Sequence, residues 1–183
     1  MDGWDGYAAS RRRITQGWVD AKVRNAVVLT GNVHRNWATD VKVDFKDPGL
    51  TRGGSELVCT SITSTGNGTG STTDATMAWN PHLKFTNDNR GYVNTKITKD
   101  ALTADFRTLD YITTPGSPVS TKASFAIRDG FLGCSSGVGL PSGTAHDSGG
   151  SAFRSRFPDP LPPASLSLRL SEIWIKTDLI NTA

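Results

Sequence analysis

The residues most able to do chemistry follow a short apolar run near the start of the chain. The run covers residues 26–30, and Asn32, His34, Arg35 and Asn36 come shortly after it. Asn32 and His34 are two positions apart, so in an extended segment their side chains would point the same way. An amide oxygen and an imidazole nitrogen are both metal ligands, and imidazole suits iron and zinc. The pattern predicts part of a metal site. The alternative is an ordinary hydrogen-bonded loop histidine.

The apolar run, Ala26 to Thr30, is continuous rather than alternating. Such a run is typical of a strand that is buried on both faces within a sheet. Gly31 ends the run. In α/β folds the carboxyl ends of such strands open into a crevice where the next residues can face a ligand. We therefore expect a buried strand with a polar site at its carboxyl end.

A helix should precede this strand, and Gly6 to Arg24 fit one. Asp5 is placed to cap its amino end, and Asn25 to close it. The apolar face of this helix should carry residues at helical spacing, namely Tyr7, Ile14, Trp18 and Val19.

Antiparallel strands should follow the polar residues. Residues 37–45 alternate, with Asp40 and Lys42 on the polar side, which predicts a half-exposed strand. The Gly-, Ser- and Thr-rich residues 63–73 should form a mobile surface loop. The further strands expected from period-two patterns are residues 55–62, 91–98, 101–112 and 119–127, with a tight hairpin at Lys99-Asp100.

Composition limits the possible classes of protein. The chain has 183 residues, 36% of them hydrophobic, and a formal charge of +3. This length supports one domain with a sizeable core. The basic run Arg11–Arg13 is explained better by a solvated helix face than by nucleic-acid binding. Two cysteines, Cys59 and Cys134, are too few for a disulfide framework. No stretch is long enough to span a bilayer.

The character of the sequence changes at Gly130. Residues 131–163 are dense in Gly, Ser and Pro without any period, although residues 165–175 alternate like a strand. We therefore expect two parts: an ordered domain over residues 1–130, and a disordered or non-native tail over residues 131–183.

Several motifs together resemble the carboxyl-terminal part of the PhoD-like alkaline phosphatases, a branch of the metallophosphoesterases. The resemblance covers residues 1 to about 130. The motifs occur in the family's order: Trp4-Asp-Gly-Tyr7, Val28-Leu-Thr-Gly-Asn-Val-His-Arg-Asn-Trp37, Gly54-Ser-Glu-Leu-Val58 with Ser61-Ile-Thr63, Asn80-Pro-His-Leu-Lys-Phe85 and Arg90-Gly-Tyr-Val93.

The resemblance implies an α/β fold. Specifically, it implies the carboxyl-terminal half of a four-layered α/β/β/α sandwich, mostly antiparallel after one helix and one buried strand. It further implies exported phosphomonoesterases and phosphodiesterases that bind ferric iron and calcium. In such enzymes the metals polarise the phosphoryl oxygens and supply a hydroxide nucleophile. Calcium prefers oxygen ligands.

Residue roles carry over by motif. His34 would be an iron ligand, and Asn32, where the family usually has Asp, a weaker calcium-side ligand. Asp5 is a further candidate metal ligand, with the helix cap as its alternative. Arg35 would join His34 and Asn32 as a catalytic residue, or it is a surface charge. Substrate contacts are expected from three residues, of which the last could equally be a loop histidine: Asn36, Tyr7 and His82.

The family's first half, which supplies most of the metal ligands, has no counterpart among these motifs. We therefore expect a truncated hydrolase, impaired alone, whose partner is a phosphoester substrate and, in a split enzyme, a separate amino-terminal half. The inner face of the sheet should be uncovered at Trp37, Val41, Val43 and Phe45. The family is periplasmic or extracellular; without a signal, this chain would be cytoplasmic. The alternative is a non-enzymatic, β-rich secreted binding or structural module.

Overall fold

The described part of the chain forms a helix layer and two sheet layers. The computed structural model describes residues 4–46, 52–64, 66–137 and 173–175. Sheet A, in the order β4-β2-β3-β1-β9, contains β1 (Val27–Thr30), β2 (Asn36–Lys42), β3 (Arg52–Val58), β4 (Leu83–Asn87) and β9 (Ile173–Ile175). Sheet B, in the order β5-β6-β7-β8, contains β5 (Gly91–Ile97), β6 (Ala101–Leu109), β7 (Val119–Arg128) and β8 (Ser135–Ser136).

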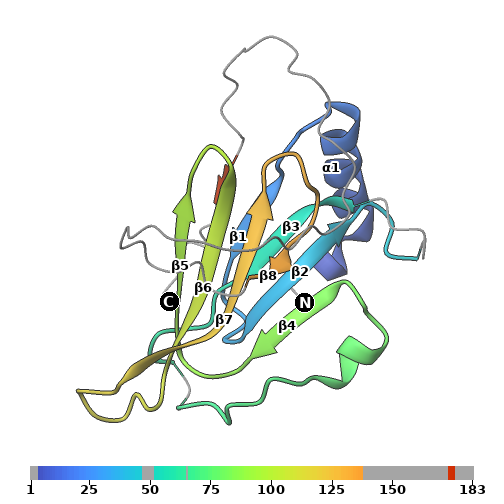
Figure 1. Ribbon diagram of the computed structural model, residues 1–183. Helices are drawn as coiled ribbons and strands as arrows, with labels where there is room; N and C mark the ends of the chain where they lie inside the picture. The colour runs from blue at the N-terminus through green and yellow to red at the C-terminus, as the bar shows by residue number, and fades with distance from the viewer. Residues whose placement is uncertain (1–3, 47–51, 65, 138–172, 176–183) are drawn as a thin grey trace, which may run out of the picture.

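Helix α1 (Ala8–Asp20) packs on one face of sheet A, and sheet B packs on the other (Figure 1). Strand pairing is antiparallel throughout sheet B, whereas β1 runs parallel to β3 and β9 in sheet A. The expected α/β class with mostly antiparallel strands is confirmed. The described residues form one helix layer and two sheet layers, and the four-layered sandwich stays a prediction.

Helix α1 is shorter at both ends than the predicted helix over residues 6–24. Tyr7 occupies the cap position without a side-chain hydrogen bond, and Asp5 lies in a preceding 3-10 turn, η1 (Trp4–Gly6). The predicted cap at Asp5 is therefore wrong. The chain makes a separate turn first, and the amide of Tyr7 donates to the carbonyl of Trp4 at 3.0 Å.

The carboxyl end of α1 follows a Schellman pattern. Lys22 adopts a left-handed φ of 54°, and the amide of Val23 donates to the carbonyl of Trp18 at 2.8 Å. Trp18 is buried against sheet A, as predicted, together with Thr15. The other predicted members of the apolar face are exposed, which is a correction to the helix orientation: Tyr7, Ile14 and Val19.

Strand β1 is buried on both faces, as predicted. Val27 belongs to the core between the two sheets, and Val28 belongs to the core beneath α1. Because side chains alternate along a strand, the continuous apolar run serves both layers at once.

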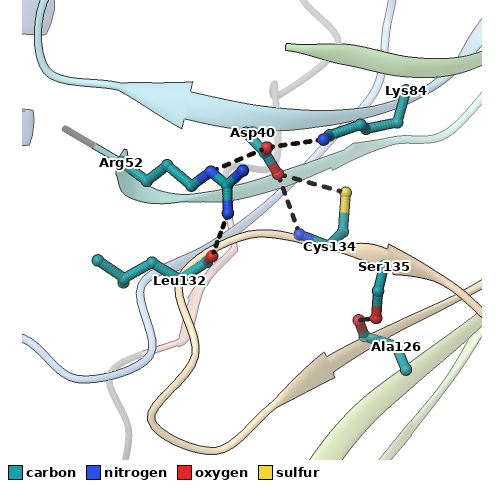
Figure 2. Close-up of polar contacts among 7 residues, drawn as sticks. All are labelled: Asp40, Arg52, Lys84, Ala126, Leu132, Cys134 and Ser135. Carbon is teal, nitrogen blue, oxygen red and sulfur yellow. Dashed lines mark hydrogen bonds and ion pairs between the residues drawn. The ribbon is translucent and has the colours of Figure 1, made fainter. Parts of the chain in front are cut away.

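Strand β2 is not half-exposed, so that prediction is wrong. Asp40 is 1% exposed, and Val41 is buried beside Trp18 on the opposite face. The polar face lies against sheet B, and Asp40 is neutralised there: its Oδ2 lies 3.1 Å from Lys84 Nζ and 3.3 Å from Arg52 Nε (Figure 2). The Arg52 contact is an ion pair rather than an aligned hydrogen bond.

Sheet B is the predicted antiparallel meander, and the turn at Lys99-Asp100 joins β5 to β6. Its inner residues, with Phe106 at the centre, pack on Ala38 and Leu57 of sheet A. The residues that were expected to be uncovered lie on the other face of sheet A. That expectation is wrong for Val41, which is buried under α1, whereas Trp37, Val43 and Phe45 are half-buried.

Residues beyond Gly130 extend this core. Cys134 is buried between the sheets, its amide donates to Asp40 Oδ1 at 3.1 Å, and β8 then pairs with β7 (Figure 2). Residues 138–172 and 176–183 lie outside the described residues, so disorder in the tail stays a prediction. In the described part of the chain, no helix is long and apolar enough to cross a membrane.

Candidate functional site

The polar segment after β1 turns sharply. We call residues 31–36 the site loop. Among the described residues, three non-glycine residues have a positive φ, and two of these are Asn32 (76°) and His34 (54°). Asn and His tolerate this conformation better than most residues, but it still costs on the order of 1 kcal/mol each. The segment is therefore not extended, and the strand-alternation argument for Asn32 and His34 does not apply.

Asn36, the last residue of the site loop, is fully buried. Its Oδ1 accepts a hydrogen bond from the Thr60 amide at 3.0 Å, which fixes the orientation of the side-chain amide. Its Nδ2 is buried and has no hydrogen-bond partner in the described part of the chain. Asn36 shares a face of β2 with Ala38, which packs toward sheet B. A donor is thus left unpaired between the sheets at the carboxyl end of β1.

Arg35 turns away from the loop toward β4. Its Nε donates to Thr86 Oγ1 at 2.7 Å and its Nη2 to the Thr73 carbonyl at 3.0 Å, and its guanidinium lies 5.5 Å from the centre of the Trp37 ring. These contacts favour a role in holding neighbouring segments together. A catalytic role for Arg35 stays a prediction.

His82 lies away from the site loop. Its carbonyl accepts from the Asp40 amide at 2.9 Å, and its ring meets Phe45 edge-on at 4.9 Å. Asp40 is four residues along β2 from Asn36, which is roughly 13 Å at 3.3 Å per residue. The structure therefore does not bring His82 to the loop. Asp5 and Tyr7 belong to the segment that begins α1, on the opposite face of sheet A from sheet B.

The sequence did not indicate two residues that lie near the site loop, Arg90 and Asp88. Arg90 donates to the carbonyl of His34 at 2.8 Å, and Asp88 has a buried Oδ1 without a hydrogen-bond partner among the described residues. Partial burial acts to raise the pKa of Asp88, but hydrogen bonds from Thr69 and Gly70 outweigh it, so the pKa is lowered. The Arg90-Gly-Tyr-Val93 motif was the available signal, but local sequence does not show which carbonyl an arginine reaches.

The segment over residues 61–74 contains residues 63–73, which were predicted to be mobile, and several hydrogen bonds tie it down. Thr69 donates to Asp88 through both its amide (3.0 Å) and its hydroxyl (2.7 Å), and Asn67 accepts from the Ile112 amide at 2.8 Å. The segment lies beside the site loop: Arg35 of the loop donates to the Thr73 carbonyl, and the amide of Thr60, just before the segment, donates to Asn36.

The described residues do not by themselves complete a metal site. No group of three or more His, Cys, Asp or Glu side chains among them could hold a metal ion. The site loop contributes one imidazole and one neutral amide. This donor set does not fit the ferric iron and calcium that the family resemblance implies.

Comparison with known proteins decides the family. The family model described as "PhoD-like phosphatase" matches residues 1–106, more than half of the chain. This chain belongs to the PhoD-like phosphatase family. That assignment confirms the resemblance, and the matched region includes the whole of α1, the site loop and Arg90.

Two relatives extend this assignment. The chain is 45% identical over 130 residues to alkaline phosphatase D of Bacillus subtilis (strain 168), and the match covers 70% of this chain and 22% of that protein. A solved structure titled "Structure of PhoD" matches with a TM-score of 0.69 and 39% identity, over 78% of this chain and 28% of that one. The chain therefore spans less than a third of the PhoD-like proteins that it matches.

Proposed function

We propose that this chain supplies part of the phosphoester site of a PhoD-type hydrolase, and that the site loop is the part supplied. Other residues, on the same polypeptide or on a second chain, would complete the site. The substrate class is a phosphate mono- or diester. An exported location, as the resemblance implies, belongs to the same proposal.

One observation carries this proposal most strongly. In a member of a phosphatase family, Asn36 holds a buried amide donor without a partner among the described residues, beside two strained residues, Asn32 and His34. An unpaired buried donor costs about 1–3 kcal/mol, and strained backbone clusters at functional sites. The cost of the unpaired donor is recovered if a phosphoryl oxygen accepts from Asn36 Nδ2 when substrate binds.

Two side chains of this chain could act on a phosphoester, those of Asn36 and His34. A buried Asn36 amide can donate to a phosphoryl oxygen, and such a donor is worth more in a site that excludes water. His34 can bind a ligand or exchange a proton, and both roles need its imidazole held in one place. Calcium and ferric iron, with Asn32, His34 and Asp5 as ligands, remain an expectation from the resemblance, because the described residues do not complete a ligand set.

A segment exchange tests the proposal. The matching 130-residue segment of the Bacillus subtilis alkaline phosphatase D is replaced by that of this chain. Turnover of a chromogenic phosphate ester is then measured with calcium and iron supplied. We expect the chimera to turn over the ester, and His34→Ala to lower kcat about 100-fold or more. A folded chimera without turnover, or His34→Ala with undiminished kcat, contradicts the proposal.

His82→Ala is the matched control. His82 and His34 are both half-buried, but His82 contacts Phe45 and Asp40 instead of the site loop. We expect His82→Ala to retain turnover within a few-fold of the chimera. The 183-residue chain assayed alone should be far slower than the chimera, and equal turnover would show that the site is already complete.

A further inference from the structure

One buried arginine connects the site loop to three other segments. Arg90 is 6% exposed. Its Nη1 lies 2.8 Å from the carbonyl oxygen of His34, 2.9 Å from that of Asp88 and 3.3 Å from Thr60 Oγ1. Its Nε donates to the carbonyl of Gly66 at 2.9 Å. A single guanidinium therefore contacts the site loop, the end of β3, the segment over residues 61–74 and the end of β4.

The backbone of Arg90 is fixed independently of these contacts. The Leu109 amide donates to the Arg90 carbonyl at 2.8 Å, and the Gly91 amide donates to the Ser61 carbonyl at 3.1 Å. A Cβ on Gly91 would lie 2.0 Å from the Arg107 carbonyl oxygen, so the chain here packs directly on β6. Arg90 thus starts from a rigid point in sheet B and reaches into the loops of sheet A.

The hydrogen bond from Arg90 to His34 is made at the residue whose backbone is strained. His34 has a φ of 54°, a conformation that persists only when the surroundings determine it. A hydrogen bond from a charged donor to the carbonyl of that same residue is among the stronger single contacts available, and burial strengthens it. The planar fork also fixes direction, which the point charge of a lysine cannot do.

We propose that Arg90 is the positioning residue that holds His34 in its left-handed conformation. The consequence for phosphoester chemistry rests on the proposed function. The conformational part does not, because it concerns only the loop. Arg90 acts through the His34 backbone and contacts no substrate.

NMR of the full 183-residue chain tests the conformational part. The readouts are the ¹³Cα and ¹³Cβ shifts and the three-bond HN–Hα coupling of His34, together with amide exchange over residues 33–35. In Arg90→Ala we expect the His34 signals to move toward values for negative φ. Loop amides should exchange about tenfold faster or more. Arg90→Lys should give a partial return of both.

Arg52→Ala is the matched control. Arg52 also donates to a backbone carbonyl, that of Leu132 at 3.2 Å, but at the other end of sheet A. This variant should leave the His34 signals unchanged. A folded Arg90→Ala or Arg90→Lys variant with wild-type His34 signals overturns the inference.

If neither Arg90 variant folds, native-state hydrogen exchange of the wild type decides. The inference requires that the amides of residues 33–35 open in the same unit as the amide of Gly91. Separate opening overturns it. The chimera assay tests the proposed function separately. If the chimera is active but the His34 signals do not respond to Arg90 substitution, only this inference fails. If the chimera is folded but inactive and the His34 signals do respond, only the proposed function fails.

Discussion

The inner face of β2 carries a buried polar side chain at each end, and the two ends differ in how these groups are paired. At one end, the carboxylate of Asp40 meets Lys84 and Arg52 and accepts from the Cys134 amide (Figure 2). At the other end, Asn36 accepts one hydrogen bond, and its Nδ2 has no partner in the part of the chain that the structure describes. The paired carboxylate and the amide of Asn36 are thus only four positions apart on one strand.

This difference indicates that Asp40 makes a structural contact, whereas Asn36 is a candidate ligand-binding group. Asp40 joins sheet A to the segment that leads into β8, and its cations reach solvent, with side-chain exposures of 39% for Arg52 and 32% for Lys84. Asn36 instead lies next to the strained His34. The carboxylate of Asp40 is fully paired within the protein, whereas the described residues offer no acceptor to Asn36 Nδ2.

The largest expected effect is at the paired end. Asp40→Ala leaves two cations and the Cys134 amide without their acceptor, so we expect the free energy of unfolding to fall by about 3 kcal/mol. Chemical denaturation measures it. Asp44→Ala is the control, because Asp44 and its partner Arg12 form a solvent-exposed ion pair that water screens, so its loss should be clearly smaller. Equal losses of unfolding free energy in the two variants would mean that the buried pairing of Asp40 stabilises the fold no more than a surface ion pair does.

A second test leaves the charges in place. Gly133 has a φ of 106°, and a Cβ there would lie 2.9 Å from Asp40 Oδ1. Gly133→Ala should therefore lower the unfolding free energy by about 2 kcal/mol through strain and displacement of the carboxylate. Gly17→Ala in α1, where a Cβ meets no atom within 4 Å, should instead stabilise the protein by about 0.5–1 kcal/mol. If Gly133→Ala is as stable as the wild type, the packing around Asp40 is looser than described.

The comparison also explains which features sequence alone could predict. The continuous run of β1 and the alternation in β5, β6 and β7 each arise from local burial, so those strands were found. The alternation in β2 correctly predicted which residues share a face of the strand, but not that α1 and sheet B cover the two faces. Asp40 was expected in solvent because the residues that cover it are distant in sequence, with Cys134 94 residues further along the chain.

The site loop shows the same limit. Asn32, His34 and Asn36 were recognised from their types and spacing. Local sequence does not show their surroundings: the carbonyl of His34 accepts a hydrogen bond from Arg90, which is 56 residues away in sequence. Helix α1 was found by its period, but its exposed and buried faces were exchanged in part, because Trp18 and Thr15 dominate the contact with sheet A.

The pH dependence of stability probes the thiol beside Asp40. Burial, followed by the charge of Asp40, raises the pKa of Cys134 from 9.0 to about 12. The thiol therefore loses its proton more readily in the unfolded chain, so its stabilising contribution is complete below pH 9 and is lost as the pH rises toward 12. From pH 9 to 10 we expect a loss of about 1 kcal/mol. Cys134→Ala should remove that part of the slope in denaturation curves, and an unchanged slope would contradict the assignment.

The smallest expected effect on stability is at Asn36 itself. Asn36→Ala removes the acceptor of the Thr60 amide but also removes an unpaired donor, so the two changes partly cancel and the loss should be below about 1 kcal/mol. Its cross-strand neighbour Asn87 is equally buried, but its amide is bonded on both sides, to Asn89. Asn87→Ala should therefore cost about 2 kcal/mol by the same denaturation measurement. In the chimera, Asn36→Ala should lower kcat/KM about tenfold. A costly Asn36→Ala with full turnover would mean that Asn36, like Asp40, serves the fold and not a ligand.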